Sequence, residues 1–489
     1  MRLGDLLIQA RLISADNLTK ALENQAERGG RLGDHMVAIG AISREALDSF
    51  LHRMPAEPSD IPATGISESD LLSLLMKLIY TNHLEMTRQF VDAIKLPYPI
   101  VVDLVQMAVD RQFLRTLGAR HGEGFGDMSY TFTEEGRKWT QGELQQSRYA
   151  GPAPVSLSEF SYLVNLQKIT NEVVTYERVR MGLGDLTVED RIIEKCGPAL
   201  NSGRALLLYG PPGNGKTSVA MSFASVFEDV IYVPYAVLVE GQVIRVFDPT
   251  YHTLKDLGPS TQGEDLGFVR REVYDARWVP CRRPFIVAGG ELTLDMLDLR
   301  FDALSNIYEA PLHVKALGGC FIIDDFGRQL VSPTALLNRW IVPLENRVDY
   351  LKLHTGARFT LPFEAMVIFS TNLEPEELMD PAFLRRLPYK IEVGAPTRDA
   401  YHNIFKTECD KRGMTLPDDL FEVIVHKILF EKEMELAAYH PRFIVDQVAA
   451  TCRFMGQPLH FELRFIEHAI DNLRVRRSSP PAPTQSLSS

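Results

Sequence analysis

The sequence has 489 residues, and at about 150 residues per domain this length predicts roughly three folded domains and excludes a single small module. Apolar residues make up 45% of the chain and charged residues 24%, which excludes wholesale disorder and collagen-like or coiled-coil architecture. The formal charge of −12 repels polyanions and argues against a protein that coats nucleic acid.

Cysteines and apolar runs exclude further classes of protein. The five cysteines lie far apart, so neither a disulfide framework nor a zinc site is expected. No apolar run approaches the roughly 18 residues of a membrane helix, and Asp5 and Arg11 interrupt the first apolar stretch before a signal sequence can form. We therefore expect a cytoplasmic protein that does not insert into a membrane.

An internal repeat occupies residues 1–54. The letters RLGD begin at Arg2 and again at Arg31, each followed by apolar residues and then by a helical pattern. Ser14 and Ser43 directly precede these helical patterns and are predicted helix N-caps. Each unit is expected to be a short apolar helix or turn, a tight glycine and a capped helix.

The paired units resemble the MshEN-type domain, which lies at the N-terminus of type II secretion and pilus-assembly ATPases and binds cyclic di-GMP. Arginine side chains would stack on or pair with guanine, and glycines would let the backbone approach the ligand closely. The residues that the resemblance implies for cyclic di-GMP are Arg2, Leu3, Gly4, Arg31, Leu32 and Gly33. The alternative is a docking module without the dinucleotide, because Arg11 and Met54 replace a glycine and a glutamine of the motif.

Residues 55–66 are rich in proline and are predicted to be a linker to a second domain at 67–148. Helical patterns cover 71–80, 87–94 and 99–111, and two short strands flank a glycine-rich loop after them. Three helices closed by a hairpin indicate a winged-helix-like domain. Reading DNA would need cations on the third helix, whose region from Pro97 to Asp110 instead carries Asp103 and Asp110 and no lysine or arginine. We expect a protein-binding or spacing role, without DNA.

Strands and helices alternate over residues 149–395, which predicts an α/β domain built on a parallel sheet. A helical pattern returns over 396–475, and the polar, proline-rich tail at 476–489 is predicted to be disordered. The expected fold is therefore a parallel-sheet α/β domain with a helical lid, preceded by a small helical tandem repeat and the winged-helix-like domain.

A glycine-rich loop with the pattern GxxxxGK[ST] follows a strand-like run at 205–209 and precedes a helical pattern. Its glycines let backbone N–H groups turn toward phosphate oxygens, and the helix N-terminus adds partial positive charge. Lys216 would neutralise the β- and γ-phosphates, and Thr217 would ligate Mg²⁺. The predicted ATP-binding residues are Gly210, Pro211, Pro212, Gly213, Asn214, Gly215, Lys216, Thr217 and Ser218.

Two further apolar runs end in polar residues. The strand predicted at 319–323 delivers Asp324 and Asp325 at its carboxyl end, where open α/β sheets bind ligands. Asp324 would hold Mg²⁺, and Asp325 would polarise the attacking water. The strand predicted at 366–370 is followed by Asn372, whose amide would lie near the γ-phosphate.

Over roughly residues 165–475 the chain resembles the AAA+ ATPases. The resemblance implies that 210–217 is the Walker A motif, that Asp324 and Asp325 form Walker B and that Asn372 is sensor 1.

The resemblance also implies three functional arginines. Arg385 or Arg386, in the DPAFLRR segment, would be an arginine finger that reaches a neighbouring subunit's γ-phosphate, and Arg442, in HPRFIVDQ, would be sensor 2 in the lid. Guanidinium groups suit this role because they stay charged and bind phosphate as a fork. A finger that acts between subunits implies a homo-oligomeric ring.

A long stretch separates the second strand, expected near Ile231–Val233, from the acidic pair. It contains a hairpin turn at Glu240-Gly241 and a strand-like run in RRPFIVAGGEL, and a hairpin in YLKLHTGARFTL precedes Asn372. These insertions resemble those of MoxR-type and MCM-type AAA+ proteins. We find no aromatic-apolar-glycine pore loop, so threading of a polymer is not expected.

The leading hypothesis is an oligomeric, ATP-hydrolysing AAA+ protein that remodels an unknown protein client and is controlled through its N-terminal domain by cyclic di-GMP. One alternative is an ATP-dependent transcription regulator whose winged helix binds DNA. Another is a scaffold that ATP switches with little turnover, since Asp325 stands where the family usually carries glutamate.

Overall fold

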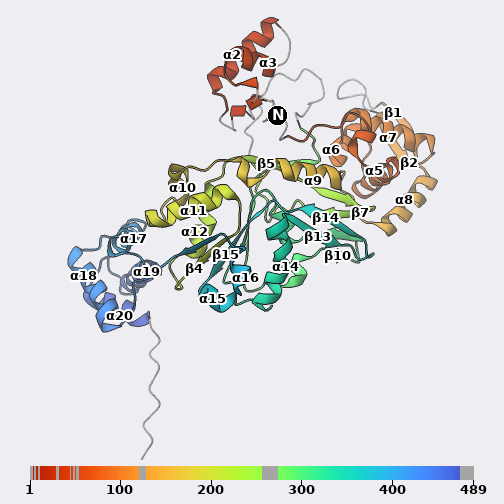
Figure 1. Cartoon of the computed structure of the whole chain (residues 1–489). Coiled ribbons are helices and arrows are strands. Elements are labelled where there is room, and N and C mark those ends of the chain that lie inside the picture. The colour runs from red at the N-terminus through yellow and green to blue at the C-terminus, as the bar shows by residue number, and fades with distance from the viewer. Residues whose placement is uncertain are drawn as a thin grey trace, which may run out of the picture.

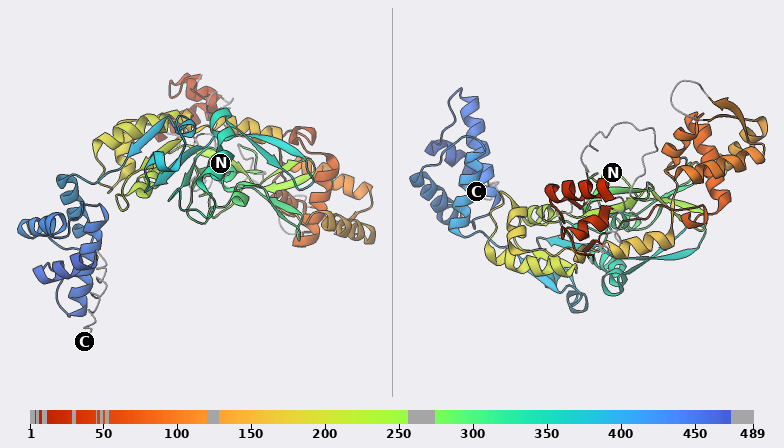
Figure 2. Two further views of the ribbon diagram at one scale, coloured as in Figure 1. Left: turned by 60° about the horizontal axis from the view of Figure 1, so that its bottom comes forward. Right: turned by 90° about the horizontal axis from the view of Figure 1, so that it is seen from above.

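The computed structural model describes residues 4, 7–8, 12–28, 32–44, 46–47, 50, 54–119, 128–255 and 274–473. These residues form an elongated molecule, in which a central α/β unit separates two helical units at opposite ends (Figure 1). Two further views show the same order, with the N-terminal helices beside the central unit (Figure 2). The predicted tail, 476–489, lies outside the described residues.

A five-stranded parallel sheet forms the centre of the molecule, as the sequence predicts. In spatial order its strands are β16 (Tyr389–Glu392), β4 (Leu206–Tyr209), β15 (Met366–Thr371), β12 (Cys320–Ile323) and β9 (Phe285–Ala288). Alternate side chains enter two separate apolar cores, Leu206 and Leu208 on one face and Leu207 on the other. Both faces of the sheet are therefore buried.

Helices cover both faces of the parallel sheet. Those on the face of Leu206 are α10 (Tyr176–Leu183), α11 (Asp190–Ser202) and α12 (Lys216–Ser222). On the face of Leu207 lies α14 (Pro333–Asn346), where Trp340 stacks on Phe321 of β12, whereas α9 (Leu157–Leu166) packs against β3 (Val155–Ser156) and β6 (Ala236–Val239) of a second sheet. Shorter helices in the connections are η1 (Pro62–Thr64), η2 (Ile169–Asn171), η3 (Phe223–Ser225), η4 (Leu294–Leu297), α13 (Leu312–Lys315), α15 (Pro375–Leu378) and α16 (Pro381–Leu384).

A strand forms at Ile231–Val233 as predicted, but its expected place as the second strand of the parallel sheet is wrong. The run at Ile231–Val233 forms β5 (Val230–Pro234), which pairs antiparallel with β8 (Trp278–Arg282) outside that sheet. The strand beside β12 is β9, which lies later in the insertion. Both runs are short and apolar, so periodicity alone does not distinguish them, and only long-range pairing does.

A second five-stranded sheet, here called the mixed sheet, packs between the parallel sheet and the middle helices. Its strands, in spatial order, are β10 (Arg300–Asp302), β11 (Ile307–Glu309), β7 (Gln242–Arg245), β6 (Ala236–Val239) and β3 (Val155–Ser156). Glu240 and Gly241, both at positive φ, form the predicted turn between β6 and β7. The other predicted hairpin is present as β13 (Val348–Lys352) and β14 (Arg358–Pro362).

The middle unit contains the helices and the strand pair expected over 67–148. Its elements are α5 (Glu68–Asn82), α6 (Thr87–Ile94), α7 (Tyr98–Asp110), β1 (Leu114–Ala119), β2 (Met128–Phe132) and α8 (Glu134–Gln146). Two hydrogen bonds attach it to the loop between β10 and β11. The Arg148 backbone N–H donates to the Ser305 carbonyl at 2.9 Å, and the Asn306 side-chain amide donates to the Gln145 backbone carbonyl at 3.2 Å.

The two terminal units each have a core of their own. The C-terminal helices, which fall within the predicted lid, are α17 (Arg398–Asp410), α18 (Asp418–His426), the π-helix η5 (Lys427–Glu431), α19 (Tyr439–Phe454) and α20 (Leu463–Asn472). The N-terminal helices are α2 (Ala15–Arg28) and α3 (Leu32–Ala38). Both predicted N-caps are present, because the Ser14 and Ser43 hydroxyls accept hydrogen bonds from the N–H groups of Asn17 and Ala46.

The buried Arg277 fastens the linker to the edge of the mixed sheet. Its Nε donates to the Asp275 carboxylate at 2.9 Å, and its Nη2 contacts the Glu159 carboxylate at 3.2 Å. Its Nη1 donates to the carbonyls of Thr64, in the linker, and Pro154, next to β3. One guanidinium thus joins three separate segments of the chain.

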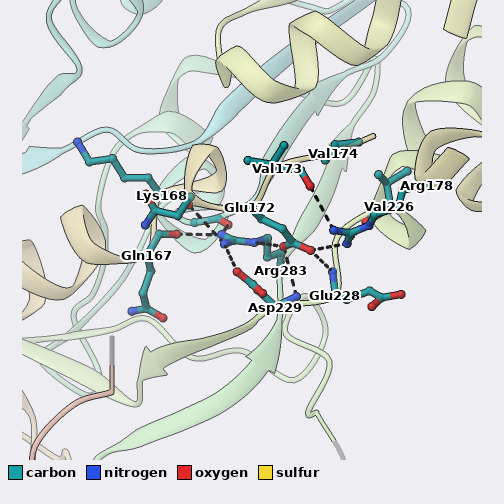
Figure 3. A network of polar contacts seen from close by, with 12 residues as sticks. Gln167, Lys168, Glu172, Val173, Val174, Arg178, Val226, Glu228, Asp229 and Arg283 are labelled. Atoms are coloured by element: carbon teal, nitrogen blue, oxygen red, sulfur yellow. Dashed lines mark hydrogen bonds and ion pairs between the residues drawn. The ribbon is translucent and has the colours of Figure 1, made fainter. Parts of the chain in front are cut away.

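A second buried arginine, Arg283, lies at the centre of a polar network with Gln167 and Glu172 (Figure 3). Its Nη1 donates to the carbonyls of Gln167 at 2.8 Å and Gly318 at 2.6 Å. Its Nε contacts the Glu172 carboxylate, which also accepts the Glu228 N–H at 2.8 Å. Because Gly318 lies just before β12, this network sets where that strand begins and hence where its carboxyl end lies.

Candidate functional site

The glycine-rich loop connects β4 to α12 in a conformation that requires its glycines. Gly210, Gly213 and Gly215 all have positive φ, at +130°, +81° and +84°. A Cβ on Gly210 would lie 2.7 Å from the Val393 carbonyl oxygen at the end of β16. Within the part of the chain that the structure describes, the N–H groups of Gly213, Asn214 and Gly215 donate to no protein acceptor. Such a run of free amides is suited to bind an anion.

Lys216 is buried at the base of this loop. Its ammonium donates to the carbonyls of Gly210 at 2.8 Å and Pro211 at 2.9 Å. Burial lowers the pKa of Lys216, while the negative charges of Asp325 and Asp324 act in the opposite direction. The cation therefore lies between the loop and the acidic pair, where bound phosphate would compete for it.

Thr217 and Asp324, the predicted magnesium pair, are in direct contact. The Thr217 hydroxyl lies 2.8 Å and 2.9 Å from the two carboxylate oxygens of Asp324. Asp324 follows β12, Thr217 lies in the first turn of α12 after β4, and β15 separates the two strands. Because all three strands run parallel, their carboxyl ends meet at one edge of the sheet.

Asp325 and Asn372 also meet there. The Asn372 amide, at the end of β15, donates to Asp325 Oδ1 at 2.8 Å. Asp325 has a φ of +48°, a left-handed conformation that is uncommon for a residue with a side chain. The backbone is thus held in a costly conformation at the residue that would position the attacking water.

Gln329 supports the acidic turn, a role that sequence patterns did not predict. Its side-chain amide donates to the carbonyl of Asp324 at 2.9 Å and contacts that of Asp325 at 3.3 Å. Its side-chain oxygen accepts the Gly327 N–H at 2.9 Å. One side chain thereby closes the turn that carries both acids. A polar residue in a loop has no periodicity or motif by which this contact is recognised.

The structure separates the two candidate finger arginines, which follow α16. Arg386 is held within the chain, because its Nε lies 2.6 Å from Glu345 and its Nη1 donates to the Ala382 carbonyl. Arg385 is exposed, and its side chain has no partner among the described residues. Neither side chain is joined to the glycine-rich loop by any contact in that part of the chain.

The C-terminal helices approach the loop through residues other than Arg442. The Arg442 side chain is 74% exposed, and its Nε lies 3.8 Å from Asp446. The Ala438 N–H, just before α19, donates to the Asn214 side-chain oxygen in the loop at 3.1 Å. The adjacent Tyr439 lies against Gly213. The sequence pointed to neither contact.

The predicted cyclic di-GMP residues are only partly described. Arg2, Leu3 and Arg31 lie outside the described residues. Gly4 packs inside the unit, since a Cβ there would lie 2.2 Å from Leu18 Cδ1. Leu32 packs against the apolar core of this unit, and Gly33 is buried in α3. The described glycines therefore have a packing reason that does not involve a ligand.

The described residues show no other metal or membrane feature. Over these ranges, no three or more histidine, cysteine or acidic side chains gather in a way that could hold a metal ion. No helix of the described chain is long and apolar enough to cross a membrane. The five cysteines are buried and unpaired.

Comparison with known proteins gives partial similarities. A family model for a domain of unknown function (DUF8689) matches residues 397–472, the C-terminal helices. The type IV pilus assembly ATPase PilB of Myxococcus xanthus (strain DK1622) is 36% identical over 83 residues, which is 17% of this chain. The chain spans only 15% of the length of that relative.

Among solved structures, two RuvB variants from Thermotoga maritima are similar at 13% identity. The alignment with one of them covers 62% of this chain and 72% of the RuvB chain, with a TM-score of 0.34. The alignment with the other covers 59% of this chain and 70% of the RuvB chain, with a TM-score of 0.35. Scores of this size do not establish a common fold, and none of these similarities assigns the chain to a family.

Proposed function

We propose that this protein binds and hydrolyses ATP, as an AAA+ ATPase with a Walker A loop at 210–217. The observation that carries the proposal is the meeting of four side chains beside a loop with free amides. Thr217 contacts Asp324, and Asn372 contacts Asp325, at one edge of the parallel sheet. Phosphate-binding amides, a buried lysine and two acids are the groups that phosphoryl transfer to water needs.

Magnesium fits the donor set of this edge. A hydroxyl oxygen from Thr217 and carboxylate oxygens from Asp324 are hard ligands of the kind that Mg²⁺ prefers, and these two residues would hold it. When bound, the ion supplies positive charge to the β- and γ-phosphate oxygens.

Different groups of the chain then bind the phosphates, neutralise their charge and position the attacking water. The free amides from Gly213 to Gly215 and the start of α12 bind the phosphate chain. Lys216 exchanges its two carbonyl acceptors for phosphate oxygens, which neutralises charge there. Asp325 orients the attacking water and draws on its proton, while Asn372 holds the Asp325 carboxylate in place.

Three arginines complete the proposal. Arg385 is the better candidate for the arginine finger, because Arg386 is already paired with Glu345. A finger acts on the next subunit, so the active form is a homo-oligomeric ring. Arg442, exposed on α19, would close over bound ATP as sensor 2.

We propose that the N-terminal and middle units regulate ATP hydrolysis by the α/β unit. Residues 1–54 would be an MshEN-like domain that receives cyclic di-GMP through its two RLG segments, in a cytoplasmic protein. The winged-helix-like unit at 67–148 would contact a protein client. Its α7 carries no lysine or arginine, which favours this role over DNA binding by a transcription regulator.

The test is ATP binding and turnover by two variants of the full chain. Lys216→Ala should weaken ATP binding by more than about 100-fold, because a buried charge-assisted contact to phosphate is lost. Asp325→Asn should keep binding within about threefold yet slow hydrolysis by at least about 100-fold. Calorimetry with ATP and a phosphate-release assay measure the two quantities.

Lys352→Ala is the matched control, because Lys352 is an exposed lysine on β13. It should leave both quantities unchanged. Unaltered turnover in both site variants would overturn the proposal. Tight ATP binding with no turnover in the unmodified protein would favour the alternative of an ATP-switched scaffold, for which the shorter acid at Asp325 gives a reason.

A further inference from the structure

The side chain of Gln329 directs both of its polar atoms toward neighbouring backbone. Its Nε2 contacts the carbonyls of Asp324, Asp325 and Gly289, at 2.9 Å, 3.3 Å and 3.5 Å. Its Oε1 accepts the Gly327 N–H at 2.9 Å. Because Gly289 directly follows β9, this one side chain joins the turn that carries both acids to the end of the neighbouring strand.

The backbone at Asp325 is held from several sides. Asp325 has a φ of +48°, and a residue with a side chain stays in this left-handed region only where its surroundings hold it there. The N–H groups of the residues on either side, Asp324 and Phe326, donate to carbonyls of β9 and β15 at 2.8 Å and 2.7 Å. The Asp325 carbonyl itself accepts the Arg328 N–H at 3.0 Å and faces the Gln329 amide. Gln329 therefore contacts the turn at the residue whose backbone conformation is costly.

We propose that Gln329 is a positioning residue for ATP hydrolysis, which keeps the Asp325 carboxylate where it can orient the attacking water. This inference rests on the proposed function. Aspartate is one methylene shorter than glutamate, so the place of its carboxylate depends closely on the backbone that carries it. Asn372 holds the carboxylate at 2.8 Å, and Gln329 holds that backbone. A displacement of about 1 Å at a reacting group can slow a reaction about 100-fold.

The groups that would bind ATP and magnesium do not depend on Gln329 in the same way. The Asp324 N–H bonds to β9 and its carboxylate contacts the Thr217 hydroxyl, and neither contact involves Gln329. Among the described residues, the Gln329 side chain has no polar contact with the glycine-rich loop. Loss of this side chain should therefore separate turnover from ATP binding, whereas a general loss of folding would lower both.

The test substitutes Gln329→Met in the full chain, because methionine keeps the length of the side chain and removes its hydrogen bonds. Turnover, measured by phosphate release, should fall about 10- to 100-fold, and the dissociation constant for ATP, measured by calorimetry, should stay within about threefold. Gln457→Met is the matched control and should change neither quantity, since Gln457 is exposed and its side chain has no polar contact among the described residues. An unchanged turnover rate, or a loss of ATP binding as large as the loss of turnover, would overturn the inference.

A double-variant cycle tests whether Gln329 acts through Asp325. Once Asp325→Asn has removed the carboxylate, adding Gln329→Met should slow hydrolysis by less than about threefold more, because no carboxylate remains to be misplaced. Single-turnover hydrolysis with excess protein measures such slow rates. A loss of the same factor with and without the Asp325 carboxylate would overturn the inference, since the glutamine would then act on the fold alone.

Gln329→Glu keeps the inference falsifiable if Gln329→Met does not fold. Its side chain can still accept the Gly327 N–H, but it donates to a carbonyl only when it is protonated. Turnover relative to the unmodified chain should therefore be low at about pH 8 and rise toward about pH 6. Full turnover of this variant at both pH values would overturn the inference alone. No hydrolysis by the unmodified chain would overturn the inference and the proposed function together.

Discussion

The two five-stranded sheets share one apolar core, yet the candidate site forms at only one of them. In the parallel sheet, β4, β15 and β12 point the same way, so the polar residues that follow them meet at one edge. In the mixed sheet, β6 and β7 run in opposite directions, as do β10 and β11. Charged residues on its neighbouring strands pair with each other, as Arg245 of β7 does with Glu309 of β11. The direction of the strands, more than their composition, decides which sheet can bring a set of catalytic side chains together at one edge.

Charges beside the mixed sheet are paired with one another. The buried Lys315 ammonium lies 2.7 Å from Asp248 and 3.3 Å from Glu309, which belongs to β11. At the parallel sheet, Arg385 has no partner of its own among the described residues. We expect substitutions beside the mixed sheet to change stability and substitutions beside the parallel sheet to change turnover.

The largest effect should come from Arg385→Ala. Removing an arginine finger lowers phosphoryl-transfer rates by about 10³-fold, so turnover should fall by that factor while ATP binding is kept. Arg386→Ala breaks a partly exposed ion pair with Glu345 and should change turnover by less than about threefold. Steady-state phosphate release measures both.

Mixing two inactive variants tests whether the arginine acts between subunits. Arg385→Ala keeps its own loop, and Lys216→Ala keeps its finger, so mixed assemblies should regain turnover that neither variant has alone. A mixture as inactive as its components would remove the finger role from Arg385. Arg385 would then no longer distinguish the parallel sheet from the mixed sheet by its function.

The next effect concerns the edge of the mixed sheet. Arg277→Ala leaves the fully buried Asp275 without its cation, which should lower the free energy of unfolding by about 3–5 kcal/mol. Turnover per folded molecule should stay unchanged. Urea unfolding followed by circular dichroism measures the loss. Arg464→Ala, which removes an exposed pair with Glu462, should cost less than about 1 kcal/mol.

The smallest effect is a pH dependence. Burial opposes ionisation of Asp349, but hydrogen bonds from His313 and Arg339 outweigh it and hold the pKa at about 2, below the ordinary 3.8. The folded state therefore gains stability that is complete above about pH 4 and is lost as the pH falls toward 2, about 2 kcal/mol in all. Unfolding measured between pH 5 and 2 should show this slope.

The variant Asp349→Asn should flatten that slope. Burial also lowers the pKa of His313 below its ordinary 6.5, so protonating this histidine costs stability at a higher pH, as the pH falls below 6.5. Loss of stability that begins near pH 6.5 is assigned to His313, and the part that Asp349→Asn removes below pH 4 is assigned to Asp349. An unchanged slope between pH 4 and 2 in Asp349→Asn would show that the pair is not responsible.

Sequence patterns located the loop and the acids because chemistry and periodicity coincide there. Lys216, Asp324, Asp325 and Asn372 each stand at the end of a strand or the start of a helix, where a linear pattern is informative. Tyr439 approaches the loop from more than 200 residues away in the chain. Its contact depends on how two units pack, which no local pattern encodes.

The strand that was expected in the parallel sheet, β5, lies outside it, and β9 takes that place. This difference also arises because contacts between distant segments are not visible in a local pattern. Both segments are short apolar runs, and only the pairing of Ile322 with Val287 places β9 in the sheet. The turn at Glu240-Gly241 was predictable, since its conformation depends on two adjacent residues. Local rules therefore gave turns and motifs, while contacts between distant segments required the structure.

Strand β3 sets a limit on how the chain can be shortened. Val155 and Ser156 precede the loop in sequence, yet they pair with Val237 and Leu238 of β6, which follow it. A fragment that starts after residue 156 would leave β6 as an open edge, with unpaired amides ready to recruit another strand. Preparations of the isolated α/β unit should therefore begin before Val155 to avoid self-association.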